Sequence, residues 1–150
     1  MRQEWHVVKL RLRPVGASWT QLTPAQMHDL AKEMLEVLRE VHSRGFVHRD
    51  VRRANIVLAQ GWLLLDWELA APVNTPPFWH CGQWPAGGQE NGGWTYGMDL
   101  SQLGSVLSTM LDALAPASAA PRQFVAQLQR ASFATAAAAL QAMPALSAWV

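Results

Sequence analysis

The sequence predicts an α+β fold that is mainly α-helical, with one small β-hairpin. Three observations lead to this prediction. Apolar residues recur at helical spacing over 24–44, two short apolar segments flank Gln60-Gly61, and a second helical pattern is followed by an alanine-rich tail. Half of the 150 residues are apolar and only 15% are charged, so we expect one domain over 1–150 with a sizeable core.

The first expected elements are a strand and a long helix. Residues 5–12 combine β-branched and long apolar residues with partly alternating charge, which is typical of a strand. The helix has clear boundary signals. Thr23 is suited to cap it, Pro24 fits its first turn, and Gln26 completes a capping box. Gly45 supplies the stop signal.

A hairpin and a long irregular segment come next. The segments 56–59 and 62–67 are short and apolar around a glycine-containing turn, which favours a hairpin. Neither segment alternates with polar residues, so we expect the hairpin to be largely buried. Residues 71–97 contain four prolines and six glycines and predict an irregular loop. Loops of this length in a domain usually carry function.

Helical patterns dominate the last third of the chain. Leucine, valine and methionine recur over 99–111 on one broad apolar face. Beyond it, 121–143 is rich in alanine, which has the highest helix propensity, and predicts one or two further helices.

The charge balance narrows the classes of partner. The formal net charge is +1 with no basic run, which argues against nucleic acid. No apolar run is long enough to span a bilayer, and we expect no membrane partner. Cys81 is the only cysteine, which fits a reducing compartment, so we expect a cytoplasmic protein.

Three polar residues stand out beside the hairpin. Asp50 and Asn55 lie just before it, and Asp66 ends its second strand. Because a hairpin folds back on itself, Asp66 can return to the neighbourhood of Asn55, where their oxygens would suit Mg²⁺. Asp50 is then positioned to accept a proton from an attacking hydroxyl. The alternative is that these residues only cap turns, as Asp and Asn commonly do.

At this point the motifs resemble a known family. H-R-D-V-R-R-A-N at 48–55 is similar to the catalytic loop of protein kinases, and L-L-L-D-W-E at 63–68 stands where those kinases carry D-F-G. D-L-S-Q-L-G at 99–104 is similar to the start of the long helix after their activation segment. The ordered set covers about 5–112. It implies a protein-kinase-like C-terminal lobe with a small hairpin and an activation-segment-like loop.

The resemblance implies ATP and Mg²⁺ as cofactors and assigns roles to residues in the site. Asp50 would be the catalytic base, with Arg52 beside it in the catalytic loop. Asn55 and Asp66 would hold the metal and, through it, the nucleotide phosphates. Val57 would lie under the adenine ring.

The same resemblance assigns supporting roles. His48 and Trp67 would pack in the hydrophobic spine, with Trp67 replacing the usual phenylalanine. Asp99 would brace the backbone of the catalytic loop. Arg49 would bind a phosphorylated activation loop.

The chain also departs from the family pattern. Glu68 replaces the glycine of D-F-G, and no clear A-P-E motif follows. No G-x-G-x-x-G loop precedes the motifs in this sequence, so we expect the N-terminal lobe to be largely absent from this chain. We therefore expect the lone chain to be incomplete or weakly active, with a partner chain as one source of the missing lobe.

Three functions remain open from the sequence. The first is a protein kinase that phosphorylates a hydroxyl of a protein substrate, serine/threonine or tyrosine. The second is a small-molecule kinase of the aminoglycoside or choline type, which D-W-E at 66–68 also resembles. The third is a kinase-derived binding module that has lost catalysis.

Overall fold

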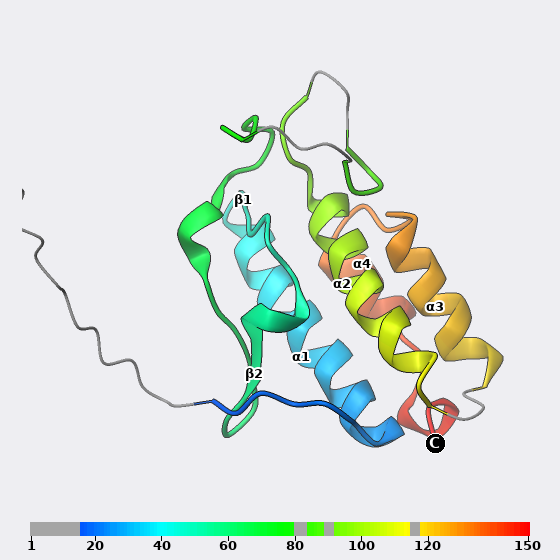
Figure 1. Ribbon diagram of the computed structural model, residues 1–150. Helices are drawn as coiled ribbons and strands as arrows, with labels where there is room; N and C mark the ends of the chain where they lie inside the picture. The colour runs from blue at the N-terminus through cyan, green and yellow to red at the C-terminus, as the bar shows by residue number, and fades with distance from the viewer. Residues whose placement is uncertain (1–15, 80–83, 89–91, 115–117) are drawn as a thin grey trace, which may run out of the picture.

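Four α-helices and two two-stranded antiparallel sheets make up the described part of the chain (Figure 1). The computed structural model describes residues 16–79, 84–88, 92–114 and 118–150. The strand expected at 5–12 lies outside these residues. None of the described helices is both long and apolar enough to cross a membrane.

The helices and strands have the following bounds. The helices are α1 (Pro24–Ser43), α2 (Tyr96–Leu111), α3 (Ala119–Gln129) and α4 (Ala136–Ala142). The strands are β1 (Phe46–Val47), β2 (Ile56–Leu58), β3 (Trp62–Leu64) and β4 (Ala71–Pro72). Single turns of 3₁₀ helix occur at Arg53–Asn55, Trp67–Leu69 and Leu146–Ala148.

Helix α1 begins and ends where the sequence predicts. The Thr23 hydroxyl accepts a hydrogen bond from the backbone N–H of Gln26 at 3.2 Å, and Gln26 Oε1 accepts one from the Thr23 N–H at 2.9 Å. This reciprocal pair is the predicted capping box. Gly45 follows the helix with a φ of 79°, a conformation that glycine adopts without steric cost.

The hairpin of β2 and β3 is confirmed, but only one of its faces is buried. Ile56 pairs with Leu64, and both side chains are buried together with Trp62. Val57 and Leu63 form the middle pair and are only half-buried, because their side chains point to the opposite face. The expectation of a largely buried hairpin was therefore wrong for half of its residues.

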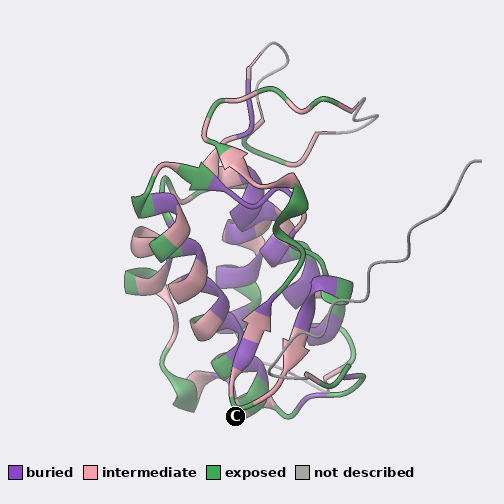
Figure 2. Ribbon diagram, turned by 90° about the vertical axis from the view of Figure 1, so that its left-hand side faces the viewer, coloured by how far each residue is buried: buried purple, intermediate pink, exposed green. Residues whose placement is uncertain are grey.

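Helix α2 lies between α1 and α3, and α4 packs against α1 (Figure 1). The approach of α2 and α3 is close at Gly104, where a Cβ atom would lie 2.5 Å from the backbone nitrogen of Gln129. The buried residues concentrate between these helices (Figure 2). The largest fully buried side chains of α1, α2 and α3 in the main core are Met27, Leu30, Met34, Leu35, Leu38, Leu100, Leu103, Leu107 and Leu128.

Two further features of the fold differ from the sequence prediction. Helix α2 begins at Tyr96, three residues before the predicted start, with Thr95 at its N-cap. The second feature is a short sheet that the sequence did not suggest, in which Phe46 pairs with Pro72 and Val47 with Ala71. This sheet holds the entry of the 48–55 loop against the chain that leaves the hairpin.

Candidate functional site

The loop at 48–55 is held from below by the carboxylate of Asp99, which is fully buried near the start of α2. Asp99 Oδ2 accepts hydrogen bonds from the backbone N–H of His48 at 2.8 Å and from His42 Nε2 at 3.0 Å. Asp99 Oδ1 accepts from the backbone N–H of Arg49 at 2.9 Å and from Trp94 Nε1 at 2.9 Å. Four donors thus converge on one side chain and fix the conformation of the loop.

A second side chain of α2 extends this support. Gln102 Oε1 accepts a hydrogen bond from the backbone N–H of Val51 at 3.0 Å, and Gln102 Nε2 donates to the Arg49 carbonyl at 3.1 Å. Sequence reasoning missed this role, as it missed those of His42 and Trp94. The one available signal was spacing, since Gln102 lies three positions after Asp99 and on the same helix face.

Asp50 and Asn55 are joined directly. Asn55 Nδ2 donates to Asp50 Oδ2 at 2.7 Å and to the Asp50 backbone carbonyl at 2.9 Å. Asn55 is buried, whereas the Asp50 side chain remains partly exposed. Arg52 Nε lies 3.0 Å from the same Asp50 oxygen, and its side chain is 61% exposed. Asp50 Oδ2 is therefore held by Asn55 and Arg52, whereas no described residue makes a hydrogen bond or ion pair with Asp50 Oδ1.

Asp66 is brought to this pair by the hairpin. The backbone N–H of Leu65 donates to the Asn55 carbonyl at 2.7 Å, which ties the end of β3 to the start of β2. Asp66 comes next, with exposed side chain and left-handed backbone angles of φ 63° and ψ 68°. This conformation is costly for a residue with a Cβ atom. It turns the chain sharply just after the strand.

His48 connects the loop with the hairpin end. Its Nε2 donates to the Leu65 carbonyl at 3.1 Å, and its Nδ1 accepts from the backbone N–H of Asp50 at 3.2 Å. The ring meets Trp67 edge-on at a centroid distance of 4.5 Å, while Trp67 itself is 41% exposed. Both ring nitrogens are therefore used by a neutral imidazole, which donates at one and accepts at the other.

Burial lowers the pKa of His48 below its ordinary value. The negative charge of Asp99 raises this pKa most, and the charges of Asp50 and Asp66 raise it less. All three acidic side chains are thus close enough to act on this ring. Their combined effect is smaller than the cost of burying a charged imidazole, so the pKa stays below its ordinary value.

Arg49 differs from a surface arginine in burial and conformation. Its side chain is 4% exposed and its φ is 75°. One guanidinium nitrogen donates to the Thr75 carbonyl at 2.5 Å, and the group lies 5.9 Å from the ring centre of Trp79. Its Nε is buried without a hydrogen-bond partner among the described residues, and burial lowers its pKa. Arg49 thereby links the loop to the segment that follows β4.

The donor set fits a hard divalent cation with phosphate. Both side-chain hydrogen bonds that Asn55 makes to described residues use Nδ2, so neither of them occupies its Oδ1. The exposed Asp66 follows Leu65, whose backbone N–H donates to the Asn55 carbonyl. The described residues contain no cluster of three or more His, Cys, Asp or Glu side chains suited to a metal. Mg²⁺ typically uses one or two carboxylates and completes its shell with waters and substrate phosphates, so two protein ligands suffice.

Two other residues from the sequence prediction lie around this centre. Val57 is half-buried in the middle of β2, and the backbone of Gly16 passes directly against its side chain. Glu68 is exposed in the 3₁₀ turn that follows Asp66. The structure therefore gathers Asp50, Asn55 and Asp66 at one end of the hairpin, with Val57 further along the strand.

Comparison with known proteins finds a similarity of fold but no similarity of sequence to a family model or a curated protein. No family model matches the sequence, and no curated protein is significantly similar to it. Among solved structures, the chain is similar to a kinase of the Cydia pomonella granulovirus, PK-1, with a TM-score of 0.67 and 15% sequence identity. The similarity covers 81% of this chain and 58% of the viral kinase.

At 15% identity the likeness establishes the fold and leaves the activity to be argued from the site. The chain spans 58% of the length of the viral kinase. The prediction of an α+β, mainly helical, kinase-like fold is confirmed. The described part of the chain thus has a protein-kinase-like architecture, with Asp50, Asn55 and Asp66 at the end of its β2–β3 hairpin.

Proposed function

We propose that this chain is the C-terminal lobe of an ATP- and Mg²⁺-dependent kinase that transfers a phosphoryl group to a protein hydroxyl. The observation that carries the proposal is the hydrogen bond from Asn55 Nδ2 to Asp50 Oδ2, at 2.7 Å. It joins a candidate base to a candidate metal ligand. Turn capping alone does not require these two side chains to meet.

Asp50 is the proposed general base. Two backbone-anchored neighbours fix its position, since Asn55 donates to its carboxylate and His48 accepts from its backbone N–H. The partly exposed carboxylate can accept the proton of a substrate hydroxyl as that hydroxyl attacks phosphorus. Arg52 Nε lies 3.0 Å from Asp50 Oδ2, where its positive charge can help to neutralise charge on the transferred group.

Asn55 and Asp66 are the proposed ligands of the metal. Asn55 Oδ1 and the Asp66 carboxylate supply oxygen donors from two segments that the Leu65–Asn55 backbone hydrogen bond holds together. When bound, Mg²⁺ and ATP supply the phosphoryl group and neutralise its charge. Val57 is the proposed contact of the adenine ring.

We also propose that a separate N-terminal lobe completes the site. Leu65 and Trp67 flank Asp66, and they expose 40% and 41% of their surfaces, so apolar surface lies on both sides of this proposed ligand. A lobe from a partner chain or from a longer form of this protein would cover them. Without a phosphate-covering loop, we expect the isolated chain to transfer phosphate very slowly.

Calorimetric titration of the chain with Mg²⁺–ATP tests the proposal. We expect saturable binding that requires Mg²⁺ and disappears in Asp66→Asn, while the matched variant Asp112→Asn, on an exposed residue at the end of α2, binds as the wild type does. Asp50→Asn is expected to bind nucleotide and to lose transfer to a mixed protein substrate. A folded wild-type chain that takes up no Mg²⁺–ATP would instead favour a binding module without catalysis.

A further inference from the structure

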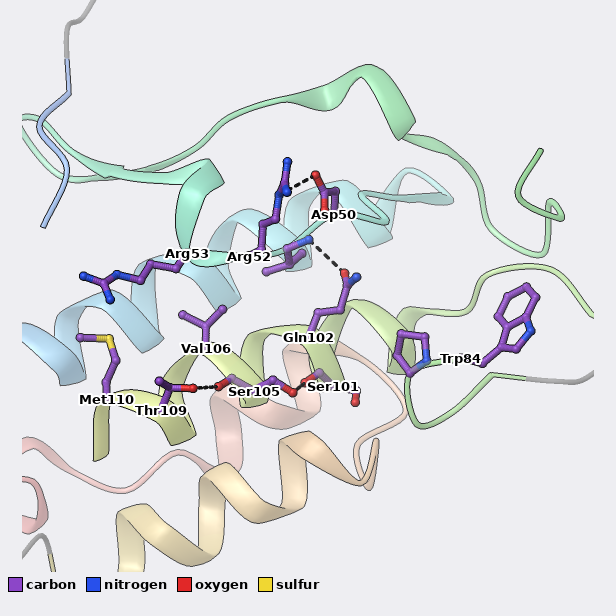
Figure 3. A pocket seen from close by; sticks show the side chains of 12 residues that line it. Asp50, Arg52, Arg53, Trp84, Ser101, Gln102, Ser105, Val106, Thr109 and Met110 are labelled. Atoms are coloured by element: carbon purple, nitrogen blue, oxygen red, sulfur yellow. Dashed lines mark hydrogen bonds and ion pairs between the residues drawn. The ribbon is translucent and has the colours of Figure 1, made fainter. Parts of the chain in front are cut away.

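An open cavity of about 680 Å³ lies directly beside Asp50. One wall is the catalytic loop with Arg52 and Arg53, and the other is the outer face of α2 with Ser105 and Thr109 (Figure 3). The cavity size is within the range of ligand-binding sites. Because the proposed base stands at its rim, an occupant of this cavity would be next to the reacting hydroxyl.

This cavity continues into a second one and becomes a groove. The second cavity, of about 330 Å³, shares Arg53, Thr109 and Met110 with the first and extends to Leu22 and Leu114. Along α2 the lining runs from residue 101 to residue 110, which is roughly 14 Å at about 1.5 Å per residue. An extended peptide covers that length with about four residues. The shape suits a polypeptide segment better than a single small molecule.

The charges in the groove are unbalanced. Its lining contains two arginines, Arg52 and Arg53, against one carboxylate, Asp50. Arg53 is held in place, because it donates to the Trp19 carbonyl at 2.6 Å and lies 5.0 Å from the centre of the Trp19 ring. Neither contact neutralises its charge. The groove therefore keeps a fixed positive charge at Arg53.

The wall formed by α2 adds acceptors without negative charge. Ser105 donates its hydroxyl hydrogen to the Ser101 carbonyl at 3.0 Å, and Thr109 donates to the Ser105 carbonyl at 3.0 Å. Below them, Val106 and Met110 give the groove an apolar floor. No acidic side chain of α2 lines either cavity to favour a basic peptide.

We propose that this groove binds an extended segment of a protein substrate that carries acidic residues beside its phosphoacceptor hydroxyl. This inference rests on the proposed function, because it uses Asp50 as the base. Arg53 and the neutral residue Thr109 determine the preference for acidic sequences. A cationic small molecule such as an aminoglycoside would meet the two arginines and be repelled.

Nuclear magnetic resonance titration of the isotope-labelled full chain, without nucleotide, tests the proposal. The probes are three serine peptides of equal length, with glutamate, glutamine or lysine at the flanking positions. We expect the glutamate peptide to bind roughly tenfold more tightly than the lysine peptide, with shifts concentrated on α2 residues of the groove. High salt should reduce the difference, because partly exposed charges are screened.

Two variants distinguish peptide binding in the groove from nonspecific electrostatic attraction. Thr109→Glu adds a negative charge to an exposed side chain inside the groove and is expected to remove most of the preference for the glutamate peptide. Gln123→Glu makes the same charge change on the exposed side of α3, outside both cavities. This variant is expected to retain the preference for the glutamate peptide. Both substitutions place glutamate, a good helix former, at a helical position.

The outcomes distinguish this inference from the proposed function. Mg²⁺–ATP binding that requires Asp66, together with equal affinity for all three peptides, would overturn the inference and leave the proposed function standing. Tighter binding of the lysine peptide, or of an aminoglycoside, would also overturn it. Loss of the preference in Thr109→Glu and its retention in Gln123→Glu would support an acidic substrate.

Discussion

The carboxylate of Asp99 holds the backbone N–H of His48 at 2.8 Å, although the two residues are 51 positions apart in the sequence. The same carboxylate also binds the next N–H of the loop, that of Arg49. A helix from the second half of the chain thus sets the backbone from which Asp50 projects. The geometry of the candidate base depends on this buried side chain, together with the support that Gln102 gives to the same loop.

Asp99→Asn is expected to destabilise the fold by about 3 kcal/mol. The substitution replaces one of the two carboxylate oxygens by an amide nitrogen. Whichever oxygen is replaced, two of the four buried donors then face another donor. Urea unfolding, followed by tryptophan fluorescence, measures the change.

Asp112→Asn is the matched control for this prediction. Asp112 follows the end of α2, its side chain is 71% exposed, and it lies 3.4 Å from Arg122. Exposed ion pairs contribute little, so we expect a change below about 1 kcal/mol. Equal effects of the two substitutions would contradict the role assigned to Asp99.

Asp66→Gly is expected to separate stability from function. Asp66 has a φ of 63°, which glycine adopts freely, so the variant should be more stable by roughly 1 kcal/mol. It should also lose Mg²⁺–ATP binding, because the carboxylate is gone. Thermal unfolding and calorimetric titration of the same sample measure both effects.

Ala131→Gly provides the comparison for backbone strain. Ala131 has a φ of 51° beyond the end of α3, far in sequence from the metal ligands. We expect a similar gain in stability with nucleotide binding unchanged. A loss of stability in Asp66→Gly would show that the carboxylate contributes more to the fold than its backbone strain costs.

The stability of the chain should fall below about pH 6.5 through His48. Burial lowers the pKa of this imidazole, so the unfolded chain takes up the proton at a higher pH than the folded chain does. Folding is therefore most favourable above the ordinary histidine pKa. The contribution is lost as the pH falls toward the lowered value, by at most about 1.4 kcal/mol per pH unit.

His48→Gln tests this assignment. Glutamine keeps a donor and an acceptor at the site but does not titrate, so the pH dependence of urea unfolding should become shallower between about pH 5 and pH 7. His28→Gln makes the same change on α1, away from the loop. If His28→Gln removed the slope and His48→Gln did not, the pH dependence would belong to another part of the molecule.

Glu33→Ala is expected to loosen the hairpin. Glu33 Oε2, on α1, accepts a hydrogen bond from the backbone N–H of Trp62 at 2.6 Å, at the start of β3. Removing this acceptor leaves a part-buried N–H unpaired, which costs roughly 1–2 kcal/mol. Hydrogen exchange at Trp62 should accelerate, whereas in Glu36→Ala, one turn further along α1, it should not.

Local patterns were enough to predict the helices and the hairpin. The cap of α1 joins Thr23 to Gln26, three residues away, and both partners are visible in the sequence. The turn at Gln60-Gly61 is equally local, and β2 and β3 adjoin it. The β1–β4 sheet was missed because its strands have only two residues each, too few to show a period.

The site was only partly visible in the sequence. The motifs drew attention to Asp50, Asn55 and Asp66, whose residue types suit a base and two metal ligands. They did not indicate that Gln102 supports the loop, nor that Arg49 is buried beside Thr75. A glutamine inside an amphipathic helix carries no distinctive signal, because its partner is a backbone N–H with no sequence signature.

The sequence predicted the helices and the β2–β3 hairpin, their order along the chain and the chemical groups available to a site. Which of these groups meet depends on the tertiary structure. Helix caps and hairpin turns close over a few residues, so composition and period reveal them. The hydrogen bonds of Asp99 and Gln102 span some 50 residues, and only the packing of α2 beneath the loop brings those partners within 3 Å.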